Sequence, residues 1–254
     1  QDRKGQYDDW FWSGGAKFDF TDRLVGQASF SQSILRPDYG NLGGVVSVND
    51  ETMMVTVPNP ELLPERSTKY YLSLQYYLPA SGLIGLSAYQ LDMEDMQVTG
   101  MTVNPEDVGF DPNEYAGYTF RSAQNLPGTS TNRGYVAEYN QQLSFLPGAW
   151  KGLGVNASIT YLDPDGERQG TPKQSANWGV RYQIGRFDFN LNGNWQSKYR
   201  VSGLNNTPTT ANNGILYHTA RELWNVSVNY KINDNFDLML AGRNIFNSPD
   251  IIYS

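Results

Sequence analysis

The residues best suited to binding a small ligand are three aromatic side chains followed by a cation in a long connecting segment. Tyr115, Tyr118 and Phe120 lead directly into Arg121. Aromatic rings beside a guanidinium can stack on a chelate ring or a sugar. The same residues could instead pack the segment against its neighbours, as aromatic residues of long loops often do. Both interpretations stay open at this level.

A second candidate is a pair of cations near the end of a polar stretch. Lys198 and Arg200 lie just before another long connection. Two cations at this place could steer an anionic ligand towards the protein. The alternative is that both line a solvated wall and pair with Asp188.

Residues for covalent or metal chemistry are scarce. The chain has no Cys and one His, His218, which excludes thiolate and multi-histidine metal sites. The segment Asp163-Pro-Asp-Gly-Glu167 resembles a short calcium loop, but Pro-Asp-Gly is also a common turn sequence. Asp92, Glu94 and Asp95 do not form a pair suited to acid–base catalysis. We therefore expect no enzyme, no catalytic residue, no metal site and no cofactor.

Composition narrows the class of protein further. The 254 residues carry 19 Lys and Arg against 26 Asp and Glu, a net charge of −7 that disfavours a nucleic-acid partner. Aromatic residues make up 13%, and there are 25 Gly. Mean hydropathy is −0.54, and there is no apolar run of about 18 residues, so a membrane-spanning helix is not expected.

Alternation of apolar and polar residues is the dominant pattern of the chain. Between Phe187 and Val201, apolar or small residues occupy one face and polar residues the other, as in a strand with one apolar side. In residues 83–93 we place Leu83, Gly85 and every second residue onwards on the apolar face, although Ile84 blurs the phase. The ten alternating tracts are 10–20, 24–34, 70–78, 83–93, 135–145, 153–161, 176–184, 187–201, 224–232 and 236–246.

The tracts and their connections predict a membrane protein. Most tracts exceed the five or six residues of typical soluble strands and suit the roughly nine to eleven needed to cross a bilayer. Short turns alternate with long loops, the latter at 36–67, 95–132, 163–173 and 202–221. Outer-membrane barrels show this alternation. The predicted fold is all-β, an antiparallel transmembrane β-barrel segment of about ten long strands with a polar inner wall.

Four short motifs, in their order along the chain, resemble those of TonB-dependent outer-membrane receptors. They are Arg36-Pro-Asp-Tyr-Gly40, Asn59-Pro-Glu-Leu-Leu-Pro-Glu-Arg66, Thr131-Asn-Arg-Gly-Tyr-Val-Ala-Glu138 and Gly242-Arg-Asn-Ile-Phe-Asn247. Leu63 stands where that family usually has Lys. The resemblance covers the back half of such a receptor, so residues 1–254 are expected to be the C-terminal portion of its barrel, without the plug domain and the final strand.

The resemblance implies a function and a set of partners. The family has about 22 strands around a plug and takes up scarce ligands across the outer membrane of Gram-negative bacteria. It couples to the TonB protein through the plug and contacts outer-membrane lipid. The expected ligand is a ferric siderophore, with cobalamin or an oligosaccharide as further options. Two other classes remain open: a passive porin, and a secreted soluble β-sandwich that binds carbohydrate.

Overall fold

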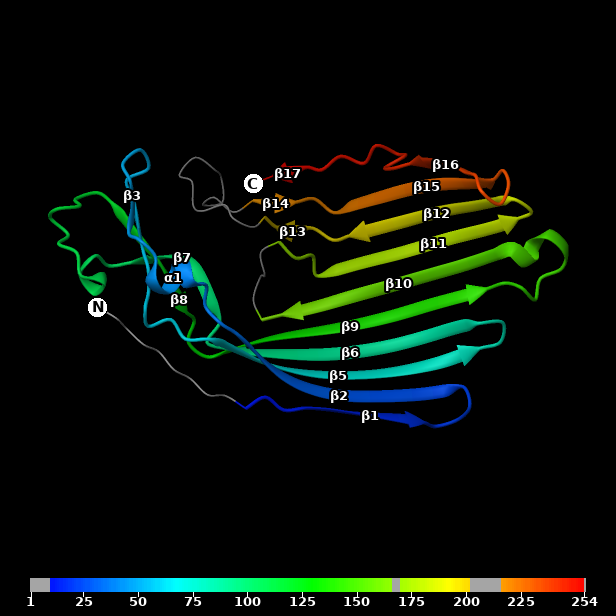
Figure 1. Ribbon diagram of the computed structural model, residues 1–254, viewed down its shortest axis with the longest axis horizontal. Helices are drawn as coiled ribbons and strands as arrows, with labels where there is room; N and C mark the ends of the chain where they lie inside the picture. Colours follow the sequence, from blue (N-terminus) through cyan, green and yellow to red (C-terminus); the bar gives the residue numbers. More distant parts are fainter. Residues whose placement is uncertain (1–9, 166–169, 202–215, 254) are drawn as a thin grey trace. The chain divides into compact units, whose positions relative to one another are not determined.

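The largest element is a sheet of ten strands that lie side by side in chain order (Figure 1). A computed structural model describes residues 10–165, 170–201 and 216–253. Every predicted tract overlaps one strand of this sheet, which confirms the fold class. In the described sheet β1 and β16 are the edges. The strands are β1 (Ser13–Asp19), β2 (Leu24–Leu35), β5 (Glu65–Leu78), β6 (Gly82–Glu94), β9 (Thr129–Gln142), β10 (Leu153–Pro164), β11 (Gln174–Ile184), β12 (Phe187–Gln196), β15 (Arg221–Lys231) and β16 (Asp237–Gly242).

The chain divides into two compact units, which are described separately. Unit 1 comprises residues 1–14, 30–69 and 91–131, and unit 2 comprises 15–29, 70–90 and 132–254. Strands β1, β2, β5, β6 and β9 contribute residues to both. Among the described residues, no helix is long and apolar enough to span a membrane.

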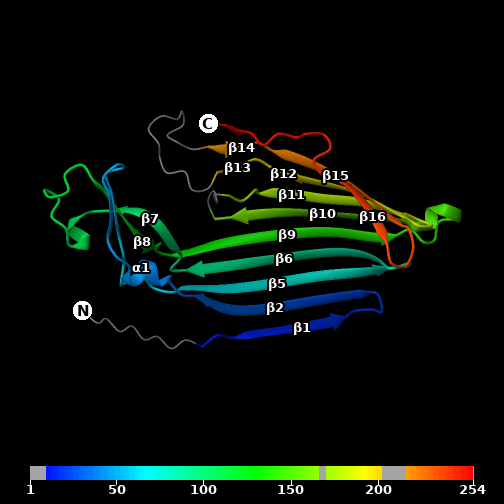
Figure 2. The same cartoon turned by 45° about the horizontal axis from the view of Figure 1, so that its top comes forward.

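The short connections of unit 2 gather at one end of the sheet, the right-hand end in Figure 1, and the strands keep their order in the turned view of Figure 2. The tightest turn joins β11 to β12 through Gly185, whose φ of 57° favours glycine. At the first turn, the Thr21 hydroxyl accepts a hydrogen bond from the Leu24 amide at 3.0 Å. Because neighbouring strands of this sheet are antiparallel, alternate connections lie at opposite ends, in agreement with the predicted alternation of short and long connections.

The sheet of unit 2 exposes an apolar face. Phe18, Leu72 and Leu240 are 61%, 61% and 65% exposed. A soluble sandwich would cover such a face with a second sheet, whereas an outer-membrane barrel presents it to lipid.

The predicted apolar face of residues 83–93 is wrong by one residue. A side chain at Gly85 would overlap the side chain of Glu138, so the odd-numbered residues of β6 share the polar face. Ile84 and Leu86 are 43% and 56% exposed on the apolar face instead. Apolar residues stand at both parities of this strand, so alternation alone could not decide its orientation.

Two connections that the sequence predicted as loops contain a second sheet, in unit 1. Its strand order is β3 (Ser47–Asn49), β4 (Met54–Val57), β8 (Thr119–Asn125), β7 (Gln97–Val103). Strands β4 and β8 are parallel. The same connections hold helix α1 (Tyr39–Gly43) and the 3₁₀ turn η1 (Glu106–Val108). Such short strands carry too few residues for a periodic signal. Their core is Val55, Val57 and Phe120.

Two asparagines fasten the 59–66 segment to β8. The Asn59 side chain donates to the Ala123 carbonyl at 2.9 Å. The Asn125 side chain donates to the Leu63 carbonyl at 3.0 Å and accepts from the Leu63 amide at 2.7 Å. The two bonds of Asn125 satisfy the backbone amide and carbonyl of Leu63, which lies outside a strand, and the bond of Asn59 joins the segment to a carbonyl of β8.

The last two connections of unit 2 end in a small three-stranded sheet and a turn. Strands β13 (Tyr199–Arg200), β14 (Tyr217–His218) and β17 (Ile252–Tyr253) pair in that order. Two predicted strands therefore end early, β12 at Gln196 and β16 at Gly242. After β16 the Asn244 side chain accepts from the Ser248 amide at 2.8 Å and donates to its carbonyl at 3.0 Å, which closes a turn. The 3₁₀ turn η2 (Gly148–Gly152) precedes β10.

Candidate functional site

Three of the predicted ligand residues, Tyr115, Tyr118 and Phe120, lie together in unit 1, and the ring of Phe120 is at their buried centre. Phe120 is 1% exposed, and Tyr115 lies edge-on to it with ring centroids 5.7 Å apart. Tyr118 lies edge-on to Tyr115 at 5.7 Å, and Phe110 lies 5.3 Å from Phe120. We call these four residues the aromatic cluster. Its edge-on geometry is that of rings packing on one another.

Arg121 lies on the opposite side of this sheet from Phe120. In the ladders, Phe120 pairs with Val55 and Val103, and Arg121 pairs with Thr56 and Thr102. Successive residues of a strand point to opposite faces. The structure thus brings the three aromatic residues together but separates the cation from them. A ligand role for the predicted residues Tyr115, Tyr118, Phe120 and Arg121 stays a prediction.

The edge of the aromatic cluster carries one polar contact. The Tyr118 hydroxyl donates to Asp50 Oδ1 at 2.8 Å. This hydrogen bond to a carboxylate raises the pKa of Tyr118, and partial burial and the charge of Asp50 act in the same direction. The phenol therefore stays protonated and continues to donate.

Lys198 and Arg200 do meet in one place, a pocket of about 290 Å³ in unit 2. Lys173 adds a third cation, and Tyr199 and Tyr217 line it as well. We call this site the cationic pocket. The sequence analysis missed Lys173. Its signal was its place at the end of the 163–173 connection, where antiparallel pairing brings it next to the end of β12.

Backbone hydrogen bonds position these three cations. Ser197 and Gln174 hold the strand ends together, because the Ser197 amide donates to the Gln174 carbonyl at 2.9 Å and the Gln174 amide donates to Ser197 Oγ at 3.1 Å. The Lys173 carbonyl accepts from Leu162 at 2.7 Å, and the Arg200 carbonyl accepts from Gly170 at 2.7 Å. The cations therefore stand on a fixed backbone.

The alternative partner of these cations is already occupied. The two carboxylate oxygens of Asp188 share the N–H of Arg181 Nε, at 3.0 and 3.1 Å. In the part of the chain that the structure describes, no carboxylate forms an ion pair with Lys198, Arg200 or Lys173. The pocket thus concentrates positive charge.

The nearby histidine is bound to its own carboxylate. His218 stacks on Tyr199 with ring centroids 4.7 Å apart, and its Nδ1 lies 2.8 Å from Asp250 Oδ1. The other oxygen of Asp250 lies 3.4 Å from Arg221. These contacts hold β13 and the segment before β17 against β14, so His218 supports one wall of the cationic pocket.

No metal-binding group is found among the described residues, in the sense of three or more His, Cys, Asp or Glu side chains close together. The calcium hypothesis for residues 163–167 falls partly outside the described residues, which stop at Asp165 in this segment.

Comparisons with known proteins agree on one family. The family model described as TonB dependent receptor-like, beta-barrel, matches residues 1–245. No curated protein sequence matches the chain significantly.

Several solved structures have a similar fold. A mutant of the ferric enterobactin receptor of Pseudomonas aeruginosa, in complex with enterobactin, has a TM-score of 0.74 and 16% identity, covering 94% of this chain and 35% of that one. The siderophore receptor PirA of Acinetobacter baumannii has a TM-score of 0.70 and 16% identity, covering 94% and 37%. The copper transporter OprC has a TM-score of 0.66 and 15% identity, covering 93% and 34%. The chain thus spans about a third of the length of these structures.

Proposed function

Because the chain belongs to the TonB-dependent receptor-like β-barrel family, we propose that it forms part of an outer-membrane receptor for active uptake of a scarce ligand. The ten-stranded sheet is part of the barrel wall, and its exposed apolar face meets outer-membrane lipid. Energy comes from TonB through a plug domain. Family membership favours this function over a passive porin, and the uncovered apolar face favours it over a soluble β-sandwich.

The ligand that we propose is a ferric siderophore, an anionic iron chelate. The cationic pocket carries this proposal, since Lys173, Lys198 and Arg200 line one cavity with two tyrosines and without an ion-paired carboxylate among the described residues. An anionic chelate would gain from the positive charge, and its aromatic rings could stack on Tyr199. Two of the similar structures are siderophore receptors by name, which supports the same class of ligand.

The aromatic cluster has a different proposed part. Phe120 is 1% exposed, and we propose that it mainly packs the second sheet. Tyr115 and Tyr118 are half-buried at its edge and could offer ring edges to a ligand once that sheet holds them in place. Cobalamin or an oligosaccharide would depend on such aromatic contacts more than on charge.

Binding of two probes of different charge tests the proposal. The receptor at its native length is titrated with ferric enterobactin, which is anionic, and with cyanocobalamin, which is uncharged. The substitutions are Lys198→Gln and Arg200→Gln, with Lys151→Gln as a control that removes an exposed cation outside the pocket.

The pocket volume gives the expected size of the effect. A sphere of about 290 Å³ has a radius of about 4 Å, and at that distance one unit charge contributes about 1 kcal/mol in water. Each substitution should therefore raise the Kd for ferric enterobactin about fivefold, and the double variant about 25-fold. Unchanged affinity in the double variant, or tight binding of cyanocobalamin alone, would refute a ferric siderophore as the ligand.

A further inference from the structure

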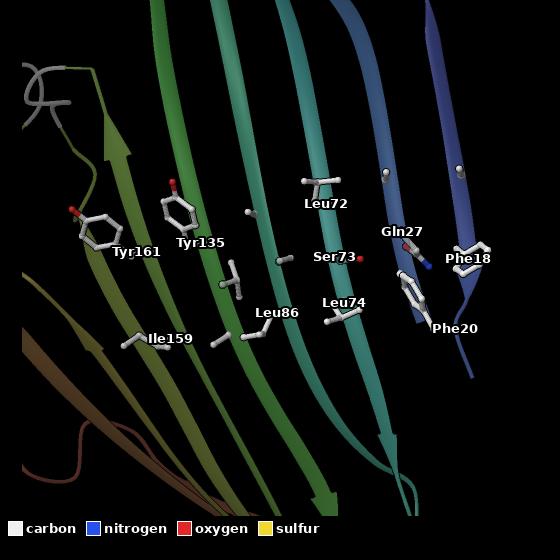
Figure 3. A pocket seen from close by; sticks show the side chains of 17 residues that line it. Phe18, Phe20, Gln27, Leu72, Ser73, Leu74, Leu86, Tyr135, Ile159 and Tyr161 are labelled. Atoms are coloured by element: carbon white, nitrogen blue, oxygen red, sulfur yellow. The ribbon is translucent and has the colours of Figure 1, made fainter. Parts of the chain in front are cut away.

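The apolar face of unit 2 contains a hollow of about 700 Å³ over strands β1, β2, β5, β6, β9 and β10 (Figure 3). Small residues line part of it, among them Ala16, Ala28, Ala88 and Ala137. Rings and branched side chains stand beside them on the same strands, as Phe18, Leu72 and Tyr135 do in the close view. The hollow is thus an interruption in a face that otherwise carries large apolar side chains.

A second hollow, of about 450 Å³, continues the first. Both are lined by Leu72, Ala88 and Tyr135, and the second adds Tyr70 and Arg133. Arg133 follows the long connection before β9, so it lies in the half of that strand away from the short turns. One end of the combined groove is therefore cationic, and most of the remaining lining is apolar.

Arg133 has spare capacity to bind an anion. Its side chain is exposed, and its Nε donates to Gln90 Oε1 at 3.0 Å. Within the described ranges, no carboxylate forms an ion pair with it. A guanidinium has five N–H donors and suits a phosphate in a bidentate geometry.

We propose that this groove binds one membrane lipid, with an acyl chain in the hollow over the alanines and a phosphate headgroup on Arg133. Two observations support a lipid. The hollow is continuous with the face that meets the bilayer, and its cationic end lies where a headgroup would be for a chain that runs along the strands. A second copy of the chain would present a similar wall of large side chains, which fills a narrow hollow less well than a flexible chain. The inference depends on the membrane position of the strands and not on the transported ligand.

Native mass spectrometry of the full-length receptor, purified in mild detergent, tests the proposal. The probes are dimyristoyl phosphatidylglycerol and dimyristoylglycerol, which have the same chains and differ in the phosphate headgroup. We expect one phosphatidylglycerol to be retained, with about tenfold weaker retention of dimyristoylglycerol, the size of one charge-assisted hydrogen bond.

Two substitutions separate the two parts of the groove. Arg133→Gln should remove the preference for the phosphate lipid, and Ala88→Leu should lower the retention of both lipids by filling the groove. The controls are Lys151→Gln, and Ala157→Leu on the same apolar face outside the hollow; circular dichroism checks the fold of each variant.

Equal retention of the two lipids by the unmodified receptor would overturn the role of Arg133. Retention that Ala88→Leu leaves unchanged, or a dimer that this substitution dissociates, would overturn a lipid in the hollow. Ferric enterobactin binding should be unchanged in Ala88→Leu, because Ala88 lines only the groove and not the cationic pocket, so this test and that of the transport function can fail separately.

Discussion

Replacing Phe120 by Ala should open the second sheet of unit 1 and leave the ten-stranded sheet folded. Phe120 is 1% exposed and packs on Val55, Val57 and the rings of Phe110 and Tyr115. Truncating a buried Phe to Ala costs about 3–5 kcal/mol. Since 1.4 kcal/mol is a factor of ten, the open fraction of this sheet should rise by about 10²-fold to about 4,000-fold. Local opening of this kind does not require global unfolding.

Amide hydrogen exchange of the full-length receptor measures this opening segment by segment. Amides of β4, β7 and β8 should exchange faster in Phe120→Ala, and those of β10, β11 and β12 should not. Val45→Ala is the matched control, since Val45 lies in the same unit and is 93% exposed. Unchanged exchange in β4 and β8 would refute the conclusion that Phe120 forms the core of this sheet. Loss of protection across β10–β12 would refute the expectation that the second sheet opens without unfolding the ten-stranded sheet.

Two further predictions follow from single contacts. Ultraviolet titration of the wild type against Tyr118→Phe should show a phenol that ionises above its ordinary pKa of about 10, because Tyr118 donates to Asp50. The stability that this bond contributes should be complete below about pH 10 and lost as pH rises through the raised pKa of Tyr118. Asp50→Asn should return the phenol to its ordinary pKa. An unshifted Tyr118 pKa in the wild type would disprove the contact. A methyl group at Gly152 would overlap the Gln183 carbonyl oxygen, so Gly152→Ala should destabilise the receptor by about 1–3 kcal/mol in thermal unfolding. Gly14→Ala, where nothing lies within 4 Å, is the control, and equal melting of the two variants would contradict the predicted overlap.

The sequence was sufficient to predict the strands of the ten-stranded sheet because alternation repeats over many residues in each strand. It failed for β6, where Ile84 and Leu83 give both faces an apolar pattern. It also failed for β4 and β8, since four to seven residues provide little periodicity and their partners are far away in the chain. Phe120 and Arg121 were grouped by proximity in sequence, but their place in a strand puts them on opposite faces.

The cationic pocket is formed by residues next to the strand ends of the ten-stranded sheet, and the pairing of these strands positions them. β12 ends at Gln196 where its partner β11 begins with Gln174, so the next residues are free to pair elsewhere. β13 pairs with β14 instead, which places Arg200 opposite Tyr217. The stacking of His218 on Tyr199 and its contact with Asp250 then fix this arrangement. Because one end of each connection is fixed by the register of the wall, the cations can converge although Lys173 and Arg200 are 27 residues apart in the chain.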